Sequence, residues 1–225
     1  MPTHFKKTIL LLFLFAGAQW VTAQIIQPTN KWERRKQAAG YFEHLSTAGL
    51  VVRLPTSHRK IAKLTEMLDS NLVAEENRPL FEQRLAQTKR ITLQRQRALV
   101  AAFEAHYDHG PVYFMADSSY VQFLADPTAV VFWNTQLQPD PNISGPGANG
   151  LVFHTGYRQP NSTMTVDQIV VTDRQRREPV RPFPRASSNV ATAFTEDPET
   201  YEISVQKWSI RLAELELKLR KWNML

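Results

Sequence analysis

The sequence contains no cysteine. It therefore has no disulfide bridge, no thiolate nucleophile, no sulfur-bound zinc and no N-terminal cysteine for lipid attachment. Because secreted eukaryotic domains of this size usually carry disulfides, their absence favours a bacterial envelope or exterior.

Glycine is also scarce, with 8 in 225 residues. Residues 145–150 (Gly-Pro-Gly-Ala-Asn-Gly) match the G-x-G-x-x-G pattern of dinucleotide-binding sites. That pattern binds phosphate where it follows a strand and opens a helix, whereas this segment follows a proline-rich loop and leads into a predicted strand. Pro146 also lacks the backbone N–H that phosphate binding would use. We therefore interpret the segment as a turn and predict no cofactor.

Basic residues are only in mild excess over acidic residues. The net charge of +6 falls to +4 without residues 1–23, which hold two lysines and no acidic residue. This balance favours contact with an anionic surface but is too weak for a nucleic-acid-binding protein, so we expect no nucleic-acid partner. The hydrophobic fraction of 43% is typical of a globular chain.

The first 23 residues have the pattern of a signal peptide. A basic head ending at Lys7 precedes the apolar run 8–15, and Val21-Thr22-Ala23 forms a small–x–small cleavage site before Gln24. The apolar core has about half the length that a bilayer-spanning helix needs. We therefore predict export to the periplasm or exterior, with no transmembrane helix in the mature chain; an uncleaved membrane anchor is the alternative.

Behind residues 1–23 we predict a linker or short helix over 24–45 and one α/β domain over 46–225. Near-continuous apolar runs separated by helical segments predict strands buried on both faces, which is typical of a parallel or mixed sheet. The predicted strands are 50–54, 112–115, 129–133 and a hairpin of 151–157 with 165–172. The expected fold is a mixed β-sheet of about five strands, flanked by a long helical crossover and a C-terminal helix.

Two long helices are predicted. One spans about 77–107, with Pro79 in its first turn. The other carries an apolar seam spaced alternately four and three residues apart: Tyr201, Val205, Trp208, Leu212, Leu215, Leu219 and Trp222. We expect this seam to pack on the sheet of a monomer, while a coiled-coil dimer is the alternative.

Polar residues follow three of the predicted strands. Asp117 and Ser118 come directly after strand 112–115, Ser57 follows strand 50–54, and Asn134 follows strand 129–133. If these strands are parallel, their carboxyl ends meet at one edge, where open α/β sheets bind ligands. We therefore take these four residues as ligand-binding candidates. A hydrolase using Asp117 and Ser118 is one interpretation, and simple helix N-caps are another.

One cluster has metal-like chemistry. His106 and His109 lie three residues apart beside Asp108, at a predicted helix end. Catalytic zinc sites use three protein ligands, and histidines in a last turn interact favourably with the helix dipole. We predict no metal here.

A basic stretch precedes the C-terminal helix. It contains Arg174, Arg176, Arg177, Arg181 and Arg185, interleaved with Pro182-Phe183-Pro184. Such a stretch can contact an anionic envelope surface such as lipid headgroups. The competing interpretation is a solvated loop with Phe183 in the core.

Three segments carry a resemblance: VYFMADSS at 112–119, VVFWNTQLQPDPNI at 130–143 and PFP at 182–184. They resemble segments of an exported bacterial protein family with no assigned function, over about residues 40–222. The order of elements is also similar to a thioredoxin-like arrangement, but the C-x-x-C motif of that family is absent. The sequence thus favours a non-enzymatic binding protein of the cell envelope with an unknown partner or anionic surface; the alternative is the hydrolase.

We predict cleavage between Ala23 and Gln24, because the basic head, apolar core and small–x–small site occur in the order that signal peptidase requires. The intact mass of protein from the envelope fraction measures this. Retention of Met1, or recovery of the protein from the cytoplasm, would contradict the prediction.

Overall fold

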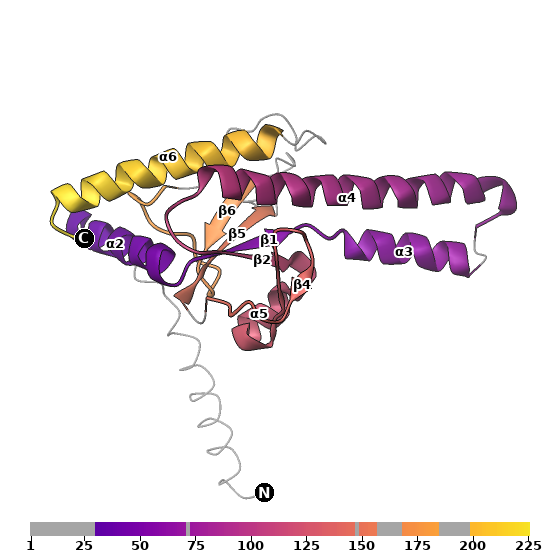
Figure 1. Ribbon diagram of the computed structural model, residues 1–225, viewed down its shortest axis with the longest axis horizontal. Helices are drawn as coiled ribbons and strands as arrows, with labels where there is room; N and C mark the ends of the chain where they lie inside the picture. The colour runs from indigo at the N-terminus through magenta and orange to yellow at the C-terminus, as the bar shows by residue number, and fades with distance from the viewer. Residues whose placement is uncertain (1–29, 71–72, 147–148, 157–167, 185–198) are drawn as a thin grey trace, which may run out of the picture. The chain divides into compact units, whose positions relative to one another are not determined.

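The computed structural model describes residues 30–70, 73–146, 149–156, 168–184 and 199–225 (Figure 1). The chain divides into two compact units, Met1–Arg34 and Arg35–Leu225. Of the first unit only 30–34 are described, where Asn30 Oδ1 accepts the Glu33 N–H at 2.8 Å and so caps helix α2 (Lys31–Thr47). Residues 1–23, which we predict to be a signal peptide, lie outside the described residues.

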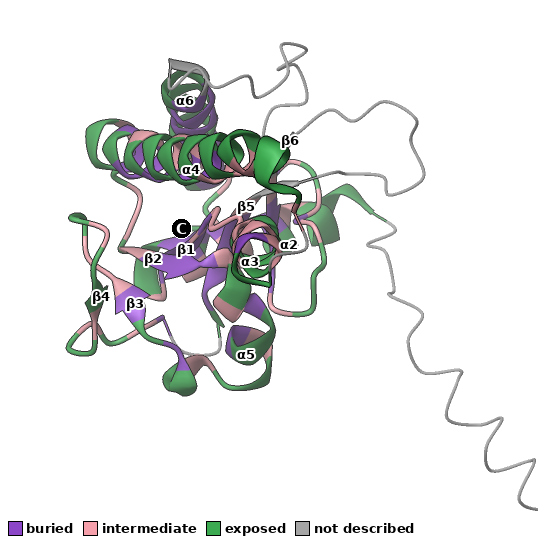
Figure 2. Ribbon diagram, turned by 90° about the vertical axis from the view of Figure 1, so that its right-hand side faces the viewer, coloured by how far each residue is buried: buried purple, intermediate pink, exposed green. Residues whose placement is uncertain are grey.

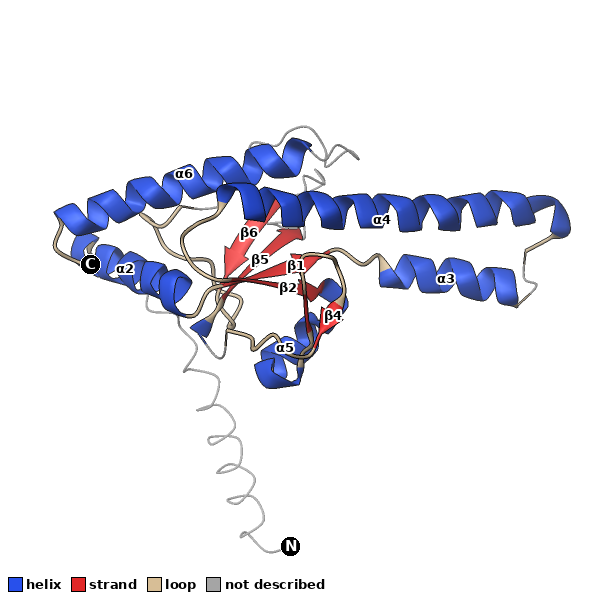
Figure 3. Cartoon of the chain, viewed as in Figure 1, coloured by secondary structure: helices blue, strands red, loops and turns tan. Residues whose placement is uncertain are grey.

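Six strands form one mixed sheet in the order β4-β3-β2-β1-β5-β6 (Figure 3). The strands are β1 Leu50–Leu54, β2 Val112–Ala116, β3 Phe132–Trp133, β4 Pro139–Asp140, β5 Leu151–Gly156 and β6 Gln168–Thr172. Strand β1 pairs in parallel with both β2 and β5, and the other pairs are antiparallel. The predicted α/β class is confirmed, with six strands instead of about five.

The remaining helices are α3 His58–Asp69, α4 Arg78–His106, α5 Tyr120–Ala125 and α6 Glu199–Lys221, with 3-10 turns at Glu75–Asn77, Asp117–Ser119 and Pro127–Ala129. Helices α3 and α4 carry the chain from β1 to β2. Figure 1 shows α3 alongside the N-terminal half of α4, away from the sheet. The predicted helix over 77–107 is confirmed as α4, which is continuous. No helix in the described ranges is both long and apolar enough to cross a membrane.

The segment 24–45, expected as a linker or short helix, is helical from Lys31 onward. Its inner face contributes Ala38, Ala39, Phe42 and Leu45 to the core, each less than a tenth exposed. The α/β unit therefore includes the chain from Arg35, not only from residue 46.

The apolar run 129–133 differs from the prediction in length and direction. Pro127–Ala129 forms a 3-10 turn, capped by the Asp126 carboxylate, which accepts the Thr128 N–H at 2.9 Å. Only Phe132 and Trp133 pair, and they run antiparallel to β2. Val131 is 47% exposed, whereas its two neighbours in the chain are buried. This alternation is typical of a strand with one face in solvent, and not of a strand buried on both faces. The short strand β4, Pro139–Asp140, is not among the predicted strands.

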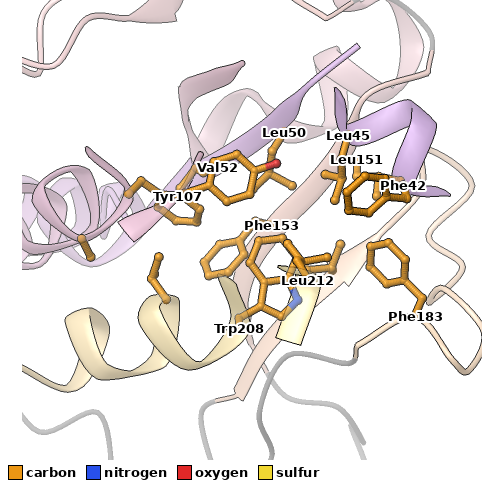
Figure 4. Close-up of a cluster of buried hydrophobic side chains, with 14 of the residues drawn as sticks. Phe42, Leu45, Leu50, Val52, Tyr107, Leu151, Phe153, Phe183, Trp208 and Leu212 are labelled. Carbon is orange, nitrogen blue, oxygen red and sulfur yellow. The ribbon is translucent and has the colours of Figure 1, made fainter. Parts of the chain in front are cut away.

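The larger core cluster lies between one face of the sheet and helices α2, α4 and α6 (Figures 2 and 4). At its centre the Trp208 ring lies nearly parallel to the Tyr107 ring, and the centroids of the two rings are 5.8 Å apart. The centroid of the Trp208 ring is also 5.7 Å from that of the Phe153 ring. Six residues of the predicted α6 seam are buried: Tyr201, Val205, Trp208, Leu212, Leu215 and Leu219. The seam therefore packs within its own chain. Phe183 is also buried, which confirms its place in the core.

A second core cluster covers the opposite face of the sheet, beneath α5. It comprises Val51, Met115, Tyr120, Phe123, Val130, Phe132 and Val152. Because both faces of β1 are covered, Leu50–Val52 and Leu54 are fully buried and only Arg53 reaches solvent. This accounts for the continuous apolar run of β1 in the sequence.

We predict that Leu212→Ala lowers the free energy of unfolding by about 2–5 kcal/mol, because it opens a cavity under a fully buried side chain. Urea denaturation of the protein beginning at Gln24 measures the loss. Leu217→Ala is the matched control on the same helix: its side chain is 69% exposed, so its effect should stay within about 0.5 kcal/mol. Equal losses in the two variants would contradict the placement of the seam.

We also predict that Tyr107→Phe leaves stability at pH 7 unchanged or raises it by up to about 1 kcal/mol. The Tyr107 hydroxyl is buried, and no described residue hydrogen-bonds it, so its removal relieves a desolvation cost. Burial, aided by the nearby Asp108 charge, raises the pKa of Tyr107.

The unfolded chain therefore ionises at this position before the folded one, and wild type should lose stability above about pH 10 relative to Tyr107→Phe. Urea denaturation at pH 7 and at about pH 10.5 measures both effects. A free energy of unfolding that is lower in Tyr107→Phe than in wild type at pH 7 would contradict the prediction.

Candidate functional site

The carboxyl ends of β1 and β2 lie side by side because Leu54 pairs with Ala116 in a parallel ladder. The residues that follow the two strands therefore emerge at one edge of the sheet. There the Asp117 carboxylate oxygen Oδ1 accepts the Thr56 backbone N–H at 3.1 Å and also the Thr56 hydroxyl. We call this Thr56–Asp117 pair the edge clasp. It joins two positions that are 61 residues apart in the chain.

Ser57 lies next to the edge clasp, in the left-handed conformation with φ 49°. Its hydroxyl does not cap α3; instead its Oγ accepts a hydrogen bond from the Thr92 hydroxyl at 2.9 Å. Two residues earlier, the Pro55 carbonyl accepts from Gln96 Nε2 at 2.8 Å. The segment between β1 and α3 is therefore hydrogen-bonded both to α4 and to the 3-10 turn that follows β2.

Ser118 follows the edge clasp and is exposed. No described residue is hydrogen-bonded to its hydroxyl, and the neighbouring carboxylate is already bonded to Thr56. Neither Asp117 nor Ser118 caps a helix, because the 3-10 turn at Asp117–Ser119 and helix α5 begin without a side-chain cap.

Asn134 does not belong to this edge. Because β3 is antiparallel to β2, with Phe114 opposite Trp133, the chain after Trp133 runs away from the carboxyl end of β2. The Asn134 Oδ1 accepts the backbone N–H groups of Gln136 and Gln138 at 3.1 and 3.0 Å and so stabilises the turn between β3 and β4. The expectation that Asn134 shares an edge with Asp117 is wrong, because strand direction cannot be read from an apolar run.

Sequence reasoning missed a basic and aromatic cluster on the α5 face of the sheet. Arg53 comes to it from the carboxyl end of β1, and Arg176 comes to it from the loop after β6, which lies at the amino end of β1. The Arg53 guanidinium carbon lies 3.9 Å from the centroid of the Tyr120 ring, and that of Arg176 lies 5.6 Å from the same centroid. The His154 ring centroid is 6.4 Å from that of Tyr120. We call Arg53, Tyr120 and Arg176 the edge cluster. Its signal in the sequence is the one charged residue in the buried strand LVVRL.

Arg53 is held in an unusual electrostatic environment. Burial lowers the pKa of its guanidinium, the Arg176 charge lowers it further, and Tyr120 and Asp117 oppose the change. Its Nε is buried, and among the described residues none accepts a hydrogen bond from it. The Arg53 side chain is thus partly desolvated, stacked on one face by an aromatic ring, and left with donor capacity.

The loop that carries Arg176 is fixed by Asp173. The Asp173 carboxylate accepts the Arg177 backbone N–H at 2.9 Å and forms an ion pair with Arg177 Nε at 2.6 Å. Next to it, Arg174 Nη2 donates to the Leu124 carbonyl at 2.7 Å. These bonds hold the loop against α5 and leave Arg176 in the left-handed conformation, with φ 61°.

His106 and His109 bind α6 at separate points. The Nε2 of His106 lies 3.3 Å from a Glu202 carboxylate oxygen, and the Nε2 of His109 lies 3.0 Å from the Ser209 carbonyl. Within the described ranges, no group of three or more histidine, aspartate and glutamate side chains is placed to hold a metal ion. Both histidines instead join the end of α4 to α6.

Comparison with protein-family models, with curated proteins and with solved structures finds no match to this chain. The resemblances to an exported family and to a thioredoxin-like arrangement stay predictions.

We predict that Asp117→Ala lowers the free energy of unfolding by about 1–3 kcal/mol, because it leaves the part-buried Thr56 N–H and hydroxyl without their acceptor. Ser118→Ala, one residue along the chain and exposed, is the matched control and should change stability by less than about 0.5 kcal/mol. Urea denaturation of the two variants decides the matter. If Asp117→Ala is as stable as Ser118→Ala, the edge clasp does not hold the edge together.

Proposed function

We propose that this protein is a non-enzymatic binding protein of the cell envelope, exported by its first 23 residues to the periplasm or exterior, and that it binds its ligand at the carboxyl edge of β1 and β2. One observation carries the proposal: Asp117, which among the described residues is the carboxylate of this edge that could serve as a base, accepts two hydrogen bonds from Thr56. An edge fixed by such bonds suits a preformed binding surface.

The alternative is a hydrolase that uses Asp117 and Ser118. A serine nucleophile needs a base within about 2.6–3.2 Å, and the base needs a further group to orient it. Ser118 has no such partner among the described residues. The arrangement closest to a catalytic one is Thr56, whose hydroxyl donates to Asp117 and lies 3.3 Å from His58 Nδ1. Its proton points to a carboxylate and not to an imidazole, which is a weak arrangement for activating a hydroxyl.

The test uses protein beginning at Gln24, immobilised and incubated with envelope extract separated into soluble proteins, polar lipids and cell-wall fragments. We expect one fraction to contain a component that is retained and whose mass does not change with time. Ser118→Ala removes the candidate nucleophile, and the mass of any component that it retains should also stay constant, because no chemistry depends on that hydroxyl.

Two tryptophan variants locate the surface. Ser118→Trp places a bulky ring at the edge, and Ser46→Trp places the same ring at an exposed position on α2. Loss of retention in the first variant only is the expected result. Time-dependent conversion of the retained component that stops in Ser118→Ala or Thr56→Val would overturn the proposal and favour the hydrolase.

A further inference from the structure

We infer that Arg53 and Arg176 together bind a phosphate-bearing ligand beside the Tyr120 ring, on the α5 face of the sheet next to its carboxyl edge. This inference rests on the proposed function, since it names the class of ligand that the binding protein takes. It adds to that function two residues and a chemistry that the polar candidates Ser57, Asp117 and Ser118 do not supply.

The first argument is the unused donor capacity of Arg53. Its guanidinium carbon lies 3.9 Å from the centroid of the Tyr120 ring, and its Nε is buried without an acceptor among the described residues. A buried donor without a partner costs free energy, and native proteins seldom leave one unsatisfied. Arg53 is partly exposed in a strand that is otherwise buried and apolar, so its charge is only partly hydrated while the side chain can still reach a ligand.

The second argument is the charge balance of the edge cluster. Arg53 and Arg176 both lie over the same ring. Of the acidic groups nearby, Asp173 is paired with Arg177 at 2.6 Å. The Asp117 carboxylate keeps its charge while it accepts the neutral Thr56 donors, so it offsets one of the two cations. One positive charge beside the Tyr120 ring is left without a counter-charge among these groups, and an anion bound there would be attracted to it.

The third argument is the backbone of the Arg176 loop. A residue with a side chain pays roughly 1 kcal/mol or more in the left-handed region, and Arg176 has φ 61°. The Arg176 N–H donates to the Asp173 carbonyl at 3.0 Å, which closes a turn at that position. The strained turn places this arginine, and not its neighbour Arg177, over Tyr120.

Phosphate fits this arrangement best among common anions. A guanidinium presents parallel N–H donors that match two phosphate oxygens. The contact with the Tyr120 ring holds the Arg53 guanidinium in place in advance, which lowers the entropy cost of binding. The ligand is either a soluble phosphate compound or the headgroup of a phospholipid, and both present phosphate oxygens to the edge cluster.

The experiment measures binding of inorganic phosphate by titration calorimetry to protein beginning at Gln24, against chloride at matched ionic strength. A second arm measures co-sedimentation with vesicles of phosphatidylglycerol and with vesicles of phosphatidylcholine. The variants are Arg176→Gln, Arg53→Lys and, as matched control, Arg211→Gln, which removes one exposed arginine from α6. Arg176 is exposed, and its side chain forms no hydrogen bond or ion pair with the described residues, so Arg176→Gln should fold even if Arg53→Lys does not.

We expect Arg176→Gln and Arg53→Lys to weaken binding about tenfold or more, and Arg211→Gln to change it less than about twofold. Binding of inorganic phosphate identifies a soluble ligand, and binding only to phosphatidylglycerol vesicles identifies a headgroup. The inference is overturned if wild type binds neither, or if Arg211→Gln weakens binding as much as Arg176→Gln, because attraction by net charge then explains the result.

The two proposals fail in different ways. If wild type retains an envelope component at the edge but binds neither phosphate nor anionic vesicles, the phosphate site is wrong and the binding function stands. If phosphate binds through Arg53 and Arg176 while a phosphate ester is hydrolysed in a manner that depends on Thr56 or Ser118, the site stands and the non-enzymatic function is wrong.

Discussion

The parallel pairing of β1 with both β2 and β5 is the constraint on which the rest of the structure depends. Parallel neighbours cannot be joined by a tight turn, so the chain must cross a face of the sheet to reach each one. The crossover from β1 to β2 supplies α4, which covers one face together with α6. The path from β2 to β5 supplies α5, which covers the other face. Strand β1 is therefore buried on both sides.

The same pairing produces the candidate site. Because β1 and β2 run in one direction, their following residues meet and form the edge clasp of Thr56 and Asp117. Arg53 occupies the last position of β1 that faces α5, where the covering layer ends. There its guanidinium is only partly hydrated but can still reach a ligand. The contact with the Tyr120 ring orients it. The strand pairing that defines the fold therefore also positions Thr56, Asp117 and Arg53.

Periodicity and apolar runs predicted the elements that depend on burial. The α6 seam is buried from Tyr201 to Leu219, and strands 50–54 and 112–115 form where apolar runs end at proline or polar residues. The direction of β3 could not be predicted, because the apolar residues Phe132 and Trp133 fit a parallel and an antiparallel strand equally well. This led to the misplacement of Asn134. A clue was present in the polar turn Asn134–Gln138, which reverses the chain at once.

The candidate site was predictable only in part. The approach of Ser57 and Asp117 to one edge followed from the order of the strands, but the bond of Asp117 to Thr56 depends on register across 61 residues. The edge cluster needs three elements, β1, α5 and the loop after β6, and no local pattern brings Arg53, Tyr120 and Arg176 together. A single arginine in a buried strand was its only trace in the sequence.

The most direct test of binding at this edge observes the arginine side chains themselves. Nuclear magnetic resonance of the Nε–H groups, recorded while inorganic phosphate or a soluble phospholipid headgroup is added, reports each arginine separately. The account predicts saturable shifts and slowed hydrogen exchange at Arg53 and Arg176, with Arg97 and Arg211, exposed on α4 and α6, unchanged. Equal shifts at all exposed arginines, or none at Arg53, would contradict it.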